Sequence, residues 1–116
     1  MKIIKLLILS FFALGMIINS AFAGGKLVIA SNASDAAPRQ AMEDIVAKFQ
    51  AANPDIEVVL NTTEHEAFKT AIRTILAADK GPDVATWFAG NRMAGFVADG
   101  LFADVSDVWA SEGWGN

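Results

Sequence analysis

The chain has 116 residues, and its 13 acidic and 9 basic side chains give a formal net charge of −4 at pH 7. An acidic protein is not expected to bind nucleic acid or an anionic membrane surface. The sequence contains no cysteine, so we expect neither disulfide bonds nor a cysteine-linked lipid anchor, and the fold has to depend on its hydrophobic core.

Residues 1–23 are expected to form a cleaved secretory signal. Lys2 and Lys5 give a charged start, a mostly apolar run follows, and Ala21-Phe22-Ala23 matches a small-x-small cleavage site. A transmembrane anchor is the alternative, because the apolar run is fairly long, but the cleavage-site pattern favours the signal. Cleavage before Gly24 would leave seven basic against thirteen acidic side chains, a net charge of −6, in one small domain.

The mature chain begins with a strand pattern at Lys26–Ser31, whose nearly continuous apolar run is typical of a buried parallel strand. A polar loop follows at 31–35. Pro38 suits the first turn of a helix, where its missing N–H is no loss, and the helix should continue to about Asn53 before Pro54 ends it. The apolar residues that helical spacing places on one face are Met42, Ile45, Val46 and Phe49.

The same order of elements then repeats. Ile56–Leu60 is the second predicted strand, and a helix is expected from about Glu64 to Asp79, with Gly81 closing it. Thr63 and Glu66 have the spacing of a capping box at the start of this helix. The apolar side chains that this helix should bury are Phe68, Ile72, Ile75 and Leu76.

A third unit starts at the turn signal Gly81-Pro82-Asp83. The apolar run Val84–Phe88 has a composition typical of a strand. Asn91 can cap a following helix that stops at Gly100, a residue type that favours left-handed terminators. This helix is expected to bury Met93, Phe96 and Val97, and a last short helix at 104–112 would carry Val108 and Trp109.

The alternation β-α-β-α-β-α predicts an α/β fold with a parallel sheet, right-handed crossovers and helices on both faces. The polar loops after the strands then lie at one edge of the sheet. Ligands bind at that edge in open α/β sheets. The loops therefore form one candidate site instead of three separate ones.

Several stretches resemble the carbohydrate-type extracellular solute-binding proteins (family 1) of ABC importers, to which maltose-binding protein belongs. In that family a strand with a Trp leads through a polar turn into a helix, and a Gly-Leu pair follows. The terminal Ser111–Trp114 also resembles members that bind glucose-like or oligomeric sugars. The matching stretches are KLVIAS, FQAANPDIEVVL and GPDVATWFAGNRMAGFVADGLFADVSD, with Trp87, Asn91, Arg92, Gly100 and Leu101 at matching places.

This resemblance implies a protein of two α/β lobes that close on a sugar between them. Residues 24–116 would form part of the N-terminal lobe, as an amino-terminal fragment from which the second lobe is absent. The complete protein is expected to be a soluble periplasmic monomer that needs no cofactor. It would deliver its sugar to the membrane permease of an ABC importer.

Three candidate sugar-binding residues lie at the end of the third predicted strand or in the turn that follows it. Trp87 could stack on the apolar face of a sugar ring, or it could fill the core. Asn91 offers both a donor and an acceptor to hydroxyl groups, or it serves only as a helix cap. Arg92 could donate to neighbouring hydroxyls, and the alternatives are a solvated charge or an ion pair with Asp99.

Three further candidates lie in the loops after the first two strands. A capping role for Glu66 leaves Glu64 as the better acceptor for a hydroxyl. Asn32 and Asp35 stand in the first loop, where ordinary turn chemistry explains them equally well. His65 is the only histidine, so no metal site of ordinary ligand count is expected around it, and a surface position at a helix start is the simpler interpretation.

The pattern favours a binding protein over an enzyme. A glycosidase needs two carboxylates across the scissile bond, and Glu64 and Glu66 would face away from each other on one helical turn. No phosphate-binding glycine-rich loop or activated nucleophile is apparent. The alternatives left open are a binding protein for a polyamine or iron, an exported glycosidase-like enzyme, and a non-functional truncated remnant.

Overall fold

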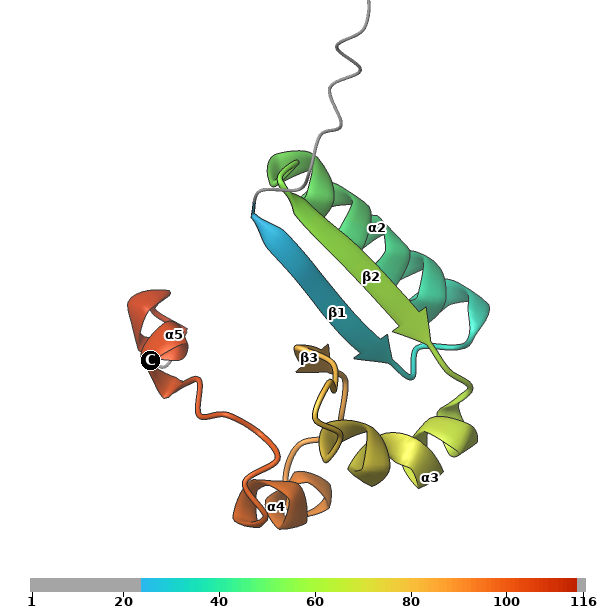
Figure 1. The fold of residues 1–116 in the computed structure, drawn as a ribbon, viewed down its shortest axis with the longest axis vertical. Coiled ribbons are helices and arrows are strands. Elements are labelled where there is room, and N and C mark those ends of the chain that lie inside the picture. The colour runs from blue at the N-terminus through green and yellow to red at the C-terminus, as the bar shows by residue number, and fades with distance from the viewer. Residues whose placement is uncertain (1–23, 115–116) are drawn as a thin grey trace, which may run out of the picture.

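The computed structural model describes residues 24–114, and the expected signal segment lies outside them. Strands and helices alternate through most of this range (Figure 1). The last predicted helix is shorter than expected. In chain order the elements are β1 (Gly25–Ser31), α2 (Ala36–Ala52), β2 (Ile56–Thr62), α3 (His65–Leu76), β3 (Val84–Ala85), α4 (Asn91–Ala98) and α5 (Ser106–Ser111).

The three strands form one parallel sheet in the order β2-β1-β3, as the alternation predicted. The strand β1 pairs with β2 along its whole length, from Gly25 opposite Ile56 to Ser31 opposite Thr62. Because all strands run the same way, their carboxyl ends lie at one edge, close to the start of α3 (Figure 1). The expected α/β fold is confirmed.

The helix α2 lies along one face of this sheet, and α3 packs near its carboxyl edge (Figure 1). Neighbouring residues of a strand point to opposite faces. Ala30 packs in a core cluster with Phe68 and Ile72 of α3, whereas Leu60, whose partner in β1 is Ile29, lines a hollow beneath α2 together with Val46. The helices α3 and α2 therefore lie on opposite sides of the sheet.

The core is small and centres on α3. Its fully buried members are Phe68 and Ile72, with Ala30 and Phe96 nearly so. The apolar face of α2 is only partly covered, since Ile45 and Phe49 are 62% and 40% exposed. Among residues 24–114, other elements contact α2 along only part of its surface. An apolar residue at helical spacing stays exposed where no other element packs against it.

The helix α4 also buries less than predicted. Phe96 enters the core, but Met93 and Val97 stay exposed. On α5, Val108 and Trp109 are both 50% exposed. The termination of α4 follows the prediction, since Gly100 takes a positive φ of 70° after the last turn.

The strand β3 is shorter than the predicted Val84–Phe88. Hydrogen bonds to β1 run only from Asp83, whose N–H donates to the Val28 carbonyl, to Thr86, whose N–H donates to the Ala30 carbonyl. The Asp83 carboxylate accepts the Val28 N–H at 2.8 Å and so takes the place of a backbone carbonyl at the start of the ladder. Trp87 and Phe88 lie beyond this ladder and begin the turn into α4.

Candidate functional site

At the carboxyl edge of the sheet, two side chains join the loops after β1 and β3. The Asn32 N–H donates to the Thr86 hydroxyl oxygen at 3.0 Å, and that hydroxyl donates to Asn32 Oδ1 at 2.9 Å. Both side chains are partly buried. Thr86 and Asn32 therefore hold each other in a fixed arrangement beyond the end of the backbone ladder.

The loop after β1 is also tied to the chain that follows β2. Ser31 is completely buried; its hydroxyl oxygen accepts the Ala33 N–H, and its carbonyl accepts the Thr63 N–H at 2.9 Å. The side-chain Nδ2 of Asn32 then reaches Nδ1 of His65, the first residue of α3, at 3.3 Å. Asn32 thus contacts both flanking segments.

An aromatic and a cationic group extend this arrangement toward α4. The rings of His65 and Phe88 meet edge to face with centroids 5.5 Å apart, and the Arg92 guanidinium lies 4.8 Å from the Phe88 ring centroid. A guanidinium over an aromatic face is attracted by the negative charge of that face. We refer to Asn32, His65, Thr86, Phe88 and Arg92 as the edge cluster.

Trp87 packs against the core, and its ring also meets that of Phe88 edge to face, with centroids 5.7 Å apart. Its indole packs against Phe68 and Phe96, with centroids 6.3 and 5.2 Å away, and its Nε1–H donates to the Arg92 carbonyl at 3.0 Å. The residue is only partly buried. Part of it lines an apolar groove of about 430 Å³ that Val84, Met93, Val97, Phe102 and Val105 also line. Trp87 therefore packs on the core and still has accessible surface.

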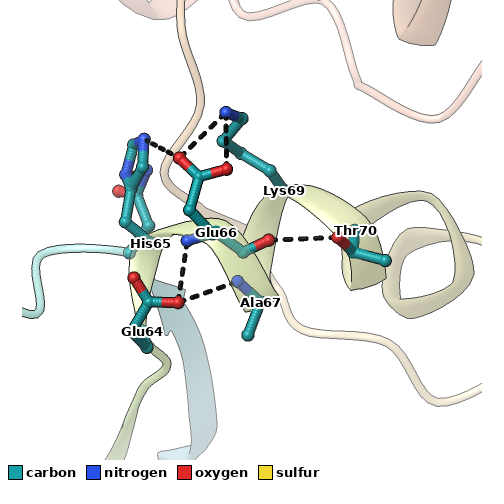
Figure 2. Close-up of polar contacts among 7 residues, drawn as sticks. Glu64, His65, Glu66, Ala67, Lys69 and Thr70 are labelled. Atoms are coloured by element: carbon teal, nitrogen blue, oxygen red, sulfur yellow. Dashed lines mark hydrogen bonds and ion pairs between the residues drawn. The ribbon is translucent and has the colours of Figure 1, made fainter.

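Glu64, not Thr63, caps α3, so the predicted capping box was wrong. Glu64 Oε2 accepts the N–H groups of Glu66 and Ala67 at 2.9 and 3.0 Å (Figure 2). Thr63 is unsuited to the role because β2 runs two residues further than predicted and the Thr63 N–H is bound to β1. The Glu66 side chain instead pairs with Lys69 at 2.9 Å.

The cap changes the acidity of Glu64. The N–H of Ala67, and then that of Glu66, donates to its carboxylate and lowers the pKa of Glu64 from the ordinary 4.5. Hydrogen bonds to the charged form always act in this direction. Glu64 is exposed, and only one of its two carboxylate oxygens, Oε2, binds these N–H groups, so Oε1 is the oxygen left outside the cap (Figure 2).

The remaining candidates are more exposed. Asp35 precedes α2 as its N-cap residue but makes no capping hydrogen bond through its side chain. Asn91 is not the cap of α4, contrary to the prediction; Gly90 takes that position with a φ of 73°, which favours glycine. The alternative ion pair of Arg92 with Asp99 was also wrong, because Asp99 pairs with Arg73.

Comparison with known proteins identifies the family. Residues 32–116 match the model of the bacterial extracellular solute-binding proteins. The chain belongs to this family. No curated protein sequence matches the chain significantly.

One solved structure similar to this solute-binding chain is that of AcbH, a bacterial solute receptor described as having an exclusive substrate preference for β-D-galactopyranose. The two share 35% sequence identity and superpose with a TM-score of 0.66. The match covers 74% of this chain and 22% of the other, so the present chain spans about a fifth of that receptor's length. Both matches are to solute-binding proteins and neither is to an enzyme.

For a solute-binding protein, the edge cluster offers suitable chemistry. Asn32 supplies an amide donor and acceptor, Arg92 supplies donors, and Phe88 supplies an aromatic face. Among residues 24–114, no three acidic or histidine side chains gather closely enough to hold a metal ion. Nor does any helix within the described range have the length and apolar character needed to cross a membrane.

Asn32 and Arg92 of the edge cluster were among the candidates named from the sequence, whereas Thr86 and Phe88 were not, and His65 was interpreted as an ordinary surface residue. The sequence did contain a signal for Thr86 and Phe88. Alternation along Ala85–Phe88 places Ala85 and Trp87 on the core side, so Thr86 and Phe88 have to point the other way. His65 and Asn32 are 33 positions apart in the sequence, so their contact could be identified only from the three-dimensional fold.

Proposed function

We propose that this chain belongs to a protein that captures a sugar outside the cytoplasm and delivers it to the permease of an ABC importer. The observation that carries the proposal is the 35% identity to a sugar receptor over 74% of the chain. The edge cluster supports it, since polar and aromatic groups meet at the sheet edge where ligands of α/β proteins bind.

In this proposal, different residues make the polar and the apolar contacts with the sugar. The Asn32 amide, the Arg92 guanidinium and Oε1 of Glu64 exchange hydrogen bonds with sugar hydroxyls. Phe88 or the accessible part of Trp87 packs on the apolar face of the ring. Asp35 and Asn91, both exposed near this edge, are the outer polar contacts. Closure of a second lobe over these residues would bury the sugar and create the form that the permease recognises.

The proposal includes export. Residues 1–23 carry the pattern of a cleaved signal, which would release the mature chain into the periplasm. We propose that the complete protein works there as a monomer.

Calorimetry on the full-length mature protein tests this function. The ligands are galactose, glucose and maltose, with spermidine and ferric citrate for the rival solutes, and nitrophenyl glycosides test for hydrolysis. We expect one sugar to bind with micromolar affinity and no glycoside to be cleaved. Binding of only spermidine or iron, or turnover of a glycoside, would replace the proposal.

A pair of variants locates the site. Arg92→Gln removes the guanidinium from the edge cluster and should weaken sugar binding by about tenfold, the equivalent of one charge-assisted hydrogen bond. Lys48→Gln makes the same change of charge on the exposed surface of α2 and should leave the affinity unchanged. Equal effects of the two substitutions would exclude Arg92 from the site.

A further inference from the structure

The side-chain amide of Asn32 has a defined orientation because of its neighbours. The Thr86 hydroxyl oxygen already accepts the Asn32 backbone N–H, at 3.0 Å, and the hydroxyl proton is directed to Asn32 Oδ1, at 2.9 Å. With Oδ1 on the Thr86 side, the Nδ2 hydrogens point toward His65. Amide orientations are assigned from such networks of donors and acceptors.

This orientation sets a requirement on His65. An amide nitrogen can only donate, so His65 Nδ1, 3.3 Å away, has to accept. The ring is then neutral and carries its proton on Nε2, which lies 3.9 Å from the Glu66 carboxylate (Figure 2). A protonated His65 would place an N–H against the Asn32 NH₂ group, two donors facing each other.

We propose that His65 is a positioning residue that sets the orientation of the Asn32 amide, and that the gain of a proton by His65 reverses it. In the reversed state the imidazolium Nδ1–H donates to Oδ1, and Nδ2 donates to the Thr86 oxygen. The Thr86 hydroxyl proton turns away from the amide. The only atom added is the proton, which comes from solvent and occupies Nδ1.

The surroundings of His65 permit both states. The ring side chain is 38% exposed, so a proton can reach it. The Glu66 and Glu64 carboxylates on its own element favour the cation, while Lys69 is paired with Glu66. From the other elements, Arg92 on α4 disfavours the cation across the Phe88 ring, and Asn32 and Phe88 are uncharged.

The reversal has a consequence for ligand binding, which rests on the proposed function. Reversal exchanges the donor and acceptor that Asn32 offers to a ligand. A site that binds its sugar at neutral pH is complementary to the neutral-state orientation. The affinity should therefore be about tenfold lower at pH 5.5 than at pH 7.5, a difference of one hydrogen bond.

The first test does not depend on any sugar. In the full-length mature protein, nitrogen NMR of the His65 ring should show the Nε2–H tautomer at pH 8. The Asn32 side-chain amide signals should shift together with the His65 titration. An Nδ1–H tautomer, or Asn32 side-chain signals that do not respond to that titration, would overturn the inference.

Two variants sharpen the test. In His65→Gln the side-chain oxygen can accept from Asn32 Nδ2 but does not titrate, so the Asn32 signals and the sugar affinity should become independent of pH. Thr86→Val removes the hydroxyl partner of Oδ1 but keeps the titrating ring beside Nδ2, so the Asn32 signals should still respond to His65. If the NMR coupling is present and no sugar binds, the proposed function fails while the inference stands. Affinity that is equal at both pH values in the unmodified protein would overturn the link to binding.

Discussion

Trp87 and Phe88 are adjacent but have different surroundings. Trp87 packs on Phe68 and Phe96 of the core, whereas Phe88 contacts His65 and Arg92 of the edge cluster. A stacking role in sugar binding and a packing role in the core therefore predict different effects for the two aromatic residues.

Trp87→Ala in the full-length protein should weaken sugar binding by roughly 1–3 kcal/mol, as expected when a large aromatic contact is lost. It should also lower the melting temperature, because the indole contacts core side chains. Calorimetry and thermal denaturation measure the two effects. Phe88→Ala is the matched comparison and should lower affinity with a smaller loss of stability. Unchanged affinity in Trp87→Ala, with lowered stability, would assign Trp87 to the core alone.

The cap formed by Glu64 should make the stability of the folded protein depend on pH. Its pKa is lowered in the folded protein because the N–H groups of Ala67 and Glu66 donate to the charged carboxylate. A lowered folded-state pKa means that the stabilisation is complete above the ordinary pKa of 4.5 and is lost as the pH falls through the lower folded-state value. The capped start of α3 is therefore most stable at neutral pH.

Glu64→Ala should lower the melting temperature at pH 7, and the difference from the unmodified protein should shrink below about pH 4. Glu64→Gln keeps an acceptor oxygen but has no charge, so it should give a smaller loss at pH 7, which also shrinks in acid as the carboxyl group of the unmodified protein becomes neutral. Melting curves over this pH range measure both. A difference between Glu64→Ala and the unmodified protein that persists undiminished in acid would contradict the role of the charged cap.

At the scale of elements, the sequence predicted the order and type of nearly every helix and strand. The periodic apolar pattern of α3 correctly identified Phe68 and Ile72 as core residues. Patterns failed where the outcome depended on a distant partner. Val84–Phe88 has strand composition, but only its first part finds β1 beside it, and the apolar pattern of α2 could not say which of its residues have a neighbour.

Prediction from the sequence had the same limit at the cap of α3 and at the edge cluster. Thr63 fits a capping box in sequence, yet its N–H completes the pairing with β1 and Glu64 takes the cap. Asn32 and Arg92 were identified as candidates from their loops. Their links through Thr86, His65 and Phe88 arise from contacts between segments far apart in sequence, which periodicity does not encode.

Asp83 is expected to fix the position of β3. Its carboxylate accepts the Val28 N–H, so Asp83→Ala would leave that donor on β1 without this partner and should destabilise the protein by about 1 kcal/mol. Asp83→Asn keeps an acceptor oxygen and should lose less. Denaturant unfolding of both variants in the full-length protein measures the difference. Equal stability of Asp83→Ala and the unmodified protein would show that water replaces the carboxylate at no cost.

At the scale of the molecule, export is the first testable property. If Ala21-Phe22-Ala23 is the cleavage signal, the mature protein begins at Gly24 and is recovered in the periplasmic fraction. N-terminal mass spectrometry of that fraction identifies the first residue. An intact Met1 found in the membrane fraction would show that residues 1–23 act as an anchor.

The segment 24–116, expressed by itself, should not reproduce the binding of the complete protein. Several of its large apolar side chains are exposed, among them Ile45, Val97 and Trp114, at 62%, 50% and 62%. The strands β2 and β3 are both edge strands of the sheet, and exposed edges promote self-association. We therefore expect this segment to be partly disordered or to aggregate.

Binding by this segment should be weak for a separate reason. A small-molecule site normally buries most of its ligand, whereas the edge cluster contacts a ligand from one side only. Micromolar binding corresponds to about 8 kcal/mol, and losing half of it leaves about 4 kcal/mol, which is millimolar affinity. Circular dichroism and calorimetry of residues 24–116 against mono- and oligosaccharides measure both properties. A monomeric, cooperatively melting segment with micromolar affinity would show that one lobe is sufficient, because every contact needed would then come from residues 24–116.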